Sequence, residues 1–173
     1  SDADISIMAE RGVKIIHCPR ANLANHGFPK TPQILEAGAS VGLGCDGAAP
    51  SNLDLFDEIK VLRYAMIGYW GLPSFNPVVM PCAKLLEMAT QGGANAIGHG
   101  DILGTVEEGK KADLILLNID QPHILPTQNL VNTIVDADDF LAANKAASSA
   151  GKAIAKFRPI HNYSSVNEAI AAY

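Results

Sequence analysis

The segment 41–47, with the sequence VGLGCDG, constrains the fold of this chain most strongly. Its apolar start predicts a short buried strand that reaches Leu43, and its glycines permit another backbone to approach closely. Asp46 then follows directly after the strand. In parallel α/β proteins the residues that carry out chemistry lie at the carboxyl ends of strands. A plain turn is the competing interpretation, because Asp-Gly is a common turn dipeptide.

A second apolar run precedes this segment and ends in a polar residue. Residues 12–19 read GVKIIHCP, so a short strand is expected to end near His17. Between the two runs, Thr31 is expected to cap a helix, and Gly38 suits the left-handed position after its last turn. The order strand, loop, helix, strand predicts a right-handed βαβ unit. His17 and Asp46 would then emerge at the same edge of the sheet.

The segment 20–30 is predicted to be a long loop at that edge. Loops of this kind form the binding face of parallel α/β proteins. Arg20, Asn22 and His26 are therefore candidates for substrate contact. A solvated loop residue is the competing interpretation for each of them. For His26 the solvated loop residue is the favoured interpretation. For Asn22 the two interpretations are equally favoured.

Four sequence motifs occur in a characteristic order along residues 4–135. They read IIHCPRANL, LEAGASVGLGCDGAAPSNLDLFDEIKVL, LLEMATQGGANAIG and LGTVEEGKKADLILLNID. Together they resemble the C-terminal part of the amidohydrolase superfamily. The most similar branch holds 5'-methylthioadenosine/S-adenosylhomocysteine deaminases, guanine deaminases and triazine chlorohydrolases.

The resemblance implies a metal-dependent (β/α)8 barrel with one divalent metal, Zn2+ or Fe2+. Asp46 matches the metal-binding aspartate at the end of strand eight, so it is expected both to bind the metal and to carry the catalytic proton. His17 matches the histidine that ends strand seven. His17 and Asn22 are expected to contact substrate.

The expected fold class is α/β, with three parts. Residues 1–100 would supply the last strands and helices of the barrel. Residues 101–135 would form part of a small flanking β-sandwich, and residues 136–173 a C-terminal helix and tail. The family pattern fails beyond residue 135, where an alanine-rich segment of helical periodicity begins.

The length and the histidine spacing limit what the chain is expected to do alone. A (β/α)8 barrel needs about 250 residues, whereas this chain has 173. Its five histidines show neither His-x-His nor His-Glu-x-x-His spacing, and catalytic zinc usually takes three protein ligands. The sequence therefore predicts a fragment that is inactive alone and holds a metal weakly or not at all. Because its sheet edges would be open, it is expected to pair with another copy or with a missing N-terminal half.

Composition and net charge limit the classes of binding partner that are expected. The net charge of −5 at pH 7 argues against binding to nucleic acid, which needs a basic face. No apolar run approaches the length of a membrane span, so no membrane partner is expected. The three cysteines form no C-x-x-C pair, which is typical of a reducing cytoplasm. The expected partner is a small heterocyclic substrate.

The preferred functional hypothesis is hydrolytic deamination, or dechlorination, of a purine-like or triazine-like ring. One alternative is a non-catalytic remnant or association module that lacks the full metal site. Another is an unrelated α/β enzyme that cradles phosphate with the G-x-G-x-x-G spacing of residues 42–47. That spacing is a weak signal here, because Asp46 would repel phosphate and the next helix is not expected before about Ser51.

Overall fold

The computed structural model describes residues 1–47, 53–76, 78–115, 117, 119 and 124–136. Backbone contacts divide the chain into two compact units, Ser1–Thr105 and Val106–Tyr173. The boundary lies close to the predicted division between residues 100 and 101. The candidate site belongs to the first unit.

The first unit is built on the predicted βαβ arrangement. Strands β1 (Lys14–His17) and β2 (Ser40–Leu43) pair in parallel, with His17 opposite Leu43. Helices α2 (Pro19–Asn25) and α3 (Thr31–Glu36) connect them. The predicted loop over residues 20–30 is therefore wrong in part. Pro19 occupies the first turn of α2, where its missing N–H leaves no hydrogen bond unmade, so the helix begins directly after the strand.

The start of α3 also differs from the prediction. Lys30 occupies the N-cap position, and Thr31 is the first helical residue. The Thr31 hydroxyl contacts His17 instead of capping the helix. Gly38 has a φ of +86° after the end of α3, as predicted for a left-handed residue.

Helix α1 (Asp2–Glu10) precedes β1, as expected from its acidic first turn. A reciprocal capping box joins Ser1 and Asp4, and Ile5 is the buried residue of the helix. Lys30 Nζ lies 2.7 Å from Asp2 Oδ1. This exposed pair connects α1 with the residue that precedes α3.

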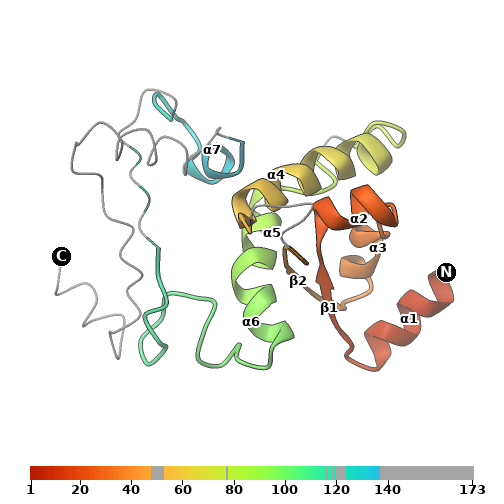
Figure 1. The fold of residues 1–173 in the computed structure, drawn as a ribbon, viewed down its shortest axis with the longest axis horizontal. Coiled ribbons are helices and arrows are strands. Elements are labelled where there is room, and N and C mark those ends of the chain that lie inside the picture. Colours follow the sequence, from red (N-terminus) through yellow and green to blue (C-terminus); the bar gives the residue numbers. More distant parts are fainter. Residues whose placement is uncertain (48–52, 77, 116, 118, 120–123, 137–173) are drawn as a thin grey trace. The chain divides into compact units, whose positions relative to one another are not determined.

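Helix α4 (Leu55–Met66) begins later than predicted. Asp54 is its N-cap, because Oδ1 accepts a hydrogen bond of 2.8 Å from the Phe56 amide. Ser51 and Asn52 are residue types that favour a helix cap, but they lie outside the described residues. Ile59, Leu62 and Met66 recur at three- and four-residue steps, which predicts one apolar face of a helix, and all three are buried. A π-helical turn, η1 (Ile67–Gly71), extends α4. In the view of Figure 1 this long helix lies above α2 and the strands.

A second helical rod packs against β2. It consists of α5 (Cys82–Glu87), the π-helical turn η2 (Met88–Gly92) and α6 (Gly93–Ala96), which follow one another without a break (Figure 1). From the sequence alone, a glycine pair such as Gly92-Gly93 predicts an interruption of the helix, and here that prediction is wrong. The pair instead permits contact with the strand. A Cβ atom on Gly92 would lie 2.4 Å from the Val41 carbonyl oxygen, and one on Gly42 would lie 2.8 Å from the Gly93 Cα.

The second unit forms one helix in its described part, α7 (Leu130–Asp136). This helix occupies residues that were expected to belong to the sandwich segment. The described residues between 106 and 129 are turns and irregular backbone without a strand, so the sandwich stays a prediction. Gly109 has a φ of +88°, in agreement with the predicted turn. The predicted C-terminal helix and tail lie outside the described residues, except for Asp136.

None of the helices in the described part of the chain is both long enough and apolar enough to cross a membrane.

The contact between Gly92 and β2 gives a stability prediction. In Gly92→Ala the new methyl group would collide with the Val41 backbone, so we expect the free energy of unfolding to fall by about 1–3 kcal/mol. The matched control is Gly93→Ala, whose Cβ would meet no atom closer than the Met88 carbonyl oxygen at 3.8 Å. That variant should gain about 0.5–1 kcal/mol from the better helix former. Urea unfolding of both variants checks the difference, and equal stability would contradict the proposed contact.

Candidate active site

Asp46 and His17 lie at the same end of the two-stranded sheet, as predicted. His17 is the last residue of β1, and its carbonyl oxygen accepts a hydrogen bond of 3.0 Å from the Gly44 amide. Asp46 follows in the loop after β2. Its side chain is exposed and its backbone has a φ of +56°, an uncommon conformation for a residue other than glycine. The parallel pairing therefore brings a solvent-accessible carboxylate next to the end of β1.

His17 is a buried, neutral imidazole. Its exposed fraction is 2%, and its Nδ1 lies 3.0 Å from the hydroxyl oxygen of Thr31. The Phe28 ring contacts it edge-on, with centroids 5.6 Å apart. Burial lowers the pKa of His17 to about 4, because the charged form loses its hydration. At neutral pH the ring can therefore donate or accept one hydrogen bond through Nε2, which is buried without a hydrogen-bond partner in the described structure.

The other predicted contact residues have local partners. Asn22 is half-buried, and its Oδ1 accepts a hydrogen bond of 3.3 Å from the Cys18 amide. Arg20 forms an ion pair of 3.1 Å with Asp57. His26 is exposed at the C-terminal end of α2. Substrate contact by Asn22 stays a prediction, since its carbonyl oxygen is already used at the start of α2.

Cys18 lies between the two strand ends. The thiol is half-buried, and none of the three cysteines forms a disulfide. Burial raises the pKa of the Cys18 thiol, opposed by the backbone amide of Asp46, which donates a hydrogen bond to the sulfur. The nearby carboxylates of Asp46 and Glu58 raise the pKa further. A thiol with a raised pKa is a poor nucleophile at neutral pH, in agreement with the packing role expected for it.

Two buried polar residues of the site were not recognised from the sequence. Thr31 was assigned to a helix cap, and Glu58 was not singled out. Both are buried, with exposed fractions of 1% and 0%. Glu58 does carry a sequence signal, because it precedes Leu62 and Met66 at four-residue steps and so shares the apolar face of α4. A carboxylate on such a face is rarely buried unless it has a partner.

The described residues do not by themselves complete a metal site. Asp46 offers the exposed carboxylate oxygen that a divalent metal binds. Within the described ranges, however, no group of three or more His, Cys, Asp and Glu side chains is placed to hold a metal ion. Asp46 thus fits one position of a catalytic metal site, and the remaining ligands are not supplied by this part of the chain.

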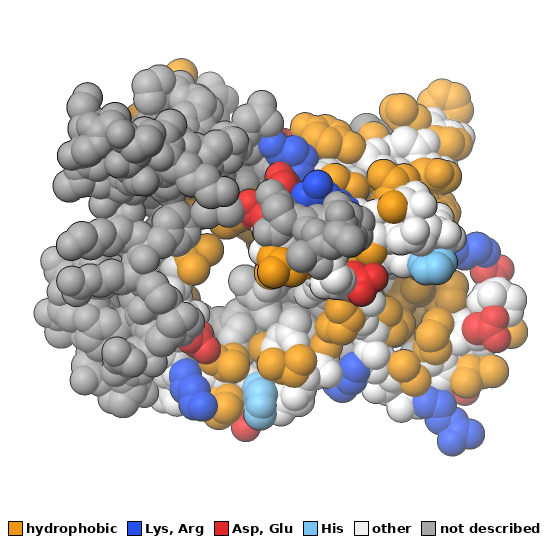
Figure 2. Space-filling view, in the orientation of Figure 1, with side chains coloured by type: hydrophobic (Ala, Val, Ile, Leu, Met, Phe, Trp, Pro, Cys, Tyr) orange, Lys and Arg blue, Asp and Glu red, His pale blue; other side chains and the backbone are white. Residues whose placement is uncertain are grey.

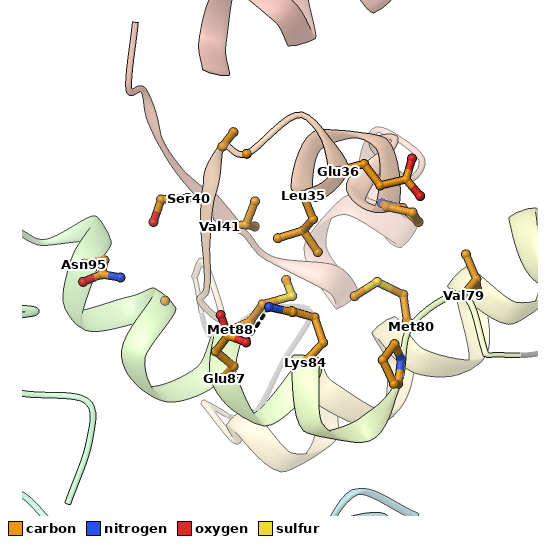
Figure 3. A pocket seen from close by; sticks show the side chains of 15 residues that line it. Leu35, Glu36, Ser40, Val41, Val79, Met80, Lys84, Glu87, Met88 and Asn95 are labelled. Atoms are coloured by element: carbon orange, nitrogen blue, oxygen red, sulfur yellow. Dashed lines mark hydrogen bonds and ion pairs between the residues drawn. The ribbon is translucent and has the colours of Figure 1, made fainter. Parts of the chain in front are cut away.

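A pocket of about 500 Å³ lies at the other end of β2. Leu35, Val41, Met80 and Met88 line it, and an ion pair between Lys84 and Glu87 crosses its rim (Figure 3). Its residues come from α3, the start of β2, residues 79–81, and the rod formed by α5, η2 and α6. Because Ser40 and Val41 are at the amino end of the strand, this pocket is separate from the candidate active site.

The charged side chains of the described residues are scattered. Figure 2 shows acidic and basic groups interspersed with apolar ones on the face it presents, without a continuous basic surface. The absence of a nucleic-acid partner stays a prediction from the net charge of −5.

The curated relatives of this chain include several proteins named 5-methylthioadenosine/S-adenosylhomocysteine deaminase. The chain is 40% identical over 131 residues to a 5-methylthioadenosine/S-adenosylhomocysteine deaminase of Desulforudis audaxviator, covering 75% of this chain and 30% of the relative. It is 39% identical over 136 residues to a deaminase of the same name from Haloquadratum walsbyi, covering 78% and 29%. The chain thus spans about 30% of the length of these curated relatives.

Solved structures agree with this similarity. A zinc-bound adenosine deaminase of Xanthomonas campestris superposes with a TM-score of 0.73 at 32% identity, covering 79% of this chain and 31% of that structure. An atrazine chlorohydrolase of Arthrobacter aurescens, in complex with zinc and atraton, gives a TM-score of 0.69 at 27% identity, covering 79% and 30%. Guanine deaminase of E. coli, at 20% identity, shares the fold with a TM-score of 0.65 over 78% of this chain and 31% of that structure.

The sequence model of the amidohydrolase family matches residues 1–153. This match covers both strands, the loop that carries Asp46 and all the helices of the first unit. The chain therefore belongs to the amidohydrolase family, in agreement with the expected α/β fold class.

Proposed function

We propose that this chain forms the C-terminal part of an enzyme that hydrolytically deaminates a purine-like ring. The observation that carries the proposal is the exposed Asp46 carboxylate at the carboxyl end of β2, beside the end of β1. The names of the relatives support the reaction class, since they are deaminases at 40% and 39% identity. A triazine-like ring is the second candidate, supported by the similarity to the atrazine chlorohydrolase.

Asp46 is proposed to bind a divalent metal and to move a proton. When bound, such a metal supplies a water that loses its proton near neutral pH. The Asp46 carboxylate is exposed and sits on a loop held against β1, so one oxygen can accept a proton and later return it to the departing amine. Zinc is the proposed metal, because the Xanthomonas and Arthrobacter structures contain it.

His17 is proposed to orient substrate as a neutral group. Its low pKa keeps the ring uncharged at neutral pH, and Thr31 fixes the ring through Nδ1. Nε2 is then the atom that can meet a polar ring atom of the substrate or an ordered water. A neutral imidazole suits an uncharged heterocycle, because no buried charge is left unpaired after product leaves.

Replacement of Asp46 tests the proposed reaction. The suitable protein is a chimera in which the N-terminal portion of the Desulforudis audaxviator deaminase precedes this chain. We expect Asp46→Asn to reduce kcat for methylthioadenosine deamination by at least about 10²- to 10⁴-fold, since the amide keeps the volume but cannot accept the proton. Asp57→Asn, at a half-exposed carboxylate on α4, serves as the control and should retain activity. Near-normal turnover of Asp46→Asn with full metal occupancy would remove Asp46 from the mechanism.

The pKa of His17 predicts a pH-dependent stability. An unfolded chain takes up a proton at this position near pH 6.5, whereas the folded chain does so only near pH 4. Between these values the unfolded state binds more protons, so the free energy of unfolding decreases as pH falls, by on the order of 3 kcal/mol in total.

Urea unfolding at several pH values between 7 and 4 checks this dependence, with about pH 4 and 6.5 as the limits of the window. His17→Gln should show a weaker pH dependence than the unmodified chain. The control His26→Gln replaces an exposed imidazole and should behave as the unmodified chain does. Identical pH dependence in all three proteins would show that His17 is not buried as a neutral ring.

The ligand set that the described residues offer is incomplete, and together with the histidine spacing of the sequence it predicts weak metal binding by the 173-residue chain alone. After dialysis against buffer that contains zinc and then against metal-free buffer, elemental analysis should find far less than one zinc per chain. Asp46→Asn should lower even this residual amount, because it removes the one exposed carboxylate of the site. Tightly held zinc at one ion per chain would contradict the prediction.

A further inference from the structure

A buried carboxylate supports the turn that follows His17. Glu58 has an exposed fraction of 0% and lies on the face of α4 that packs against α2. Its Oε2 accepts a hydrogen bond of 2.9 Å from the backbone amide of Arg20. Burial of a carboxylate is costly unless its oxygens accept hydrogen bonds, and the Arg20 amide supplies one.

The bond from Glu58 replaces a missing helix cap. Cys18 occupies the N-cap position of α2 but makes no capping hydrogen bond through its side chain. Pro19 has no amide hydrogen, and the Cys18 amide already donates to Asn22. The Arg20 amide is therefore a donor of the first turn that needs an acceptor from elsewhere, and Glu58 provides it.

The turn held by Glu58 is in contact with the loop that carries Asp46. The Asp46 amide donates to the Cys18 sulfur, and the Gly44 amide donates to the His17 carbonyl oxygen. A Cβ on Gly44 would lie 3.2 Å from that sulfur, so the backbone of this loop packs closely against the residue that follows β1. Asp46 must also keep its positive φ, which a residue with a side chain adopts only when its surroundings hold it there.

We propose that Glu58 is a positioning residue of the candidate active site, which anchors the turn between His17 and Arg20 and thereby holds Asp46 in place through Cys18. The functional part of this inference rests on the proposed role of Asp46. Glu58 acts through the reach of its carboxylate oxygen to the Arg20 amide, rather than through its charge.

The neighbouring Asp57 provides a matched control. It also contacts Arg20, but through the guanidinium group, with Oδ2 3.1 Å from Nη1. Its side chain is 46% exposed, so the pair is a surface ion pair that has little effect on structure. Asp57→Asn therefore removes a carboxylate one residue from Glu58 without touching the backbone bond.

Two conservative substitutions at Glu58 distinguish the effect of its side-chain length from the effect of its negative charge. Glu58→Gln keeps the side-chain length and one oxygen that accepts from Arg20, but it removes the charge. Glu58→Asp keeps the charge, but the oxygen is withdrawn by one methylene group. Neither variant empties the interface between α2 and α4 of a large apolar group, so both are expected to fold.

Amide hydrogen exchange of the full 173-residue chain, followed by NMR, tests the positioning role. We expect Glu58→Asp to speed the exchange of the Arg20 and Asp46 amides by about tenfold, because both hydrogen bonds open locally. The Leu85 amide in α5 reports global stability and should change much less. Glu58→Gln and Asp57→Asn should leave all three amides within about threefold of the unmodified chain.

Two outcomes would overturn the proposal. The first is unchanged exchange of Arg20 and Asp46 in Glu58→Asp. The second is an equal acceleration of the Leu85 amide, which would make Glu58 a general stabilising residue. A variant that failed to fold at all would give that second result.

The chimera with the N-terminal portion of the Desulforudis audaxviator deaminase tests the functional part. Glu58→Asp should lower kcat by about tenfold with little change in KM, because catalytic geometry is disturbed while the substrate contacts remain. Glu58→Gln should retain most of the activity, and a loss equal to that of Glu58→Asp would contradict the proposal. If Asp46→Asn proved fully active, the proposed function would fail, while the exchange data would still decide the anchoring role of Glu58.

Discussion

The parallel pairing of β1 with β2 is the interaction on which the rest of the first unit depends. It sets His17 opposite Leu43, and from this register the loop after β2 reaches the end of β1. The connection by α2 and α3 is what allows two parallel strands to be neighbours. The α5–α6 rod then covers β2 through the Gly92 contact, so strand and helix are held at a distance that no side chain would permit.

The buried polar side chains of the first unit lie near the carboxyl end of the sheet. His17, Thr31 and Glu58 all have exposed fractions of 2% or less there, whereas most other fully buried side chains of the unit are apolar. Each has a structural partner, since Thr31 contacts His17 and Glu58 accepts a hydrogen bond from the Arg20 amide. Buried polar networks are costly to build, and their concentration at one end agrees with a functional role for that end.

The chain carries one part of the proposed catalytic centre. It matches about 30% of the length of its curated relatives, and the described residues supply Asp46 without a full set of metal ligands. The arrangement nevertheless determines what that part can contribute. An exposed carboxylate in a constrained loop can bind a metal and transfer a proton, while a neutral imidazole beside it can orient an uncharged ring.

The sequence by itself determined the two strands, the positive φ at Gly38 and the position of Asp46 at a strand end. These follow from local signals, namely apolar runs, glycine and the residues that end them. Only the tertiary structure decided the roles of Thr31, Glu58 and the glycine pair at 92 and 93. Local rules assign a threonine before a helix to a cap and a glycine pair to a break, but partners distant in sequence changed both outcomes. Thr31 meets the ring of His17, Gly92 meets the Val41 backbone and Glu58 meets the Arg20 amide, and none of these contacts has a sequence periodicity that reveals its partner.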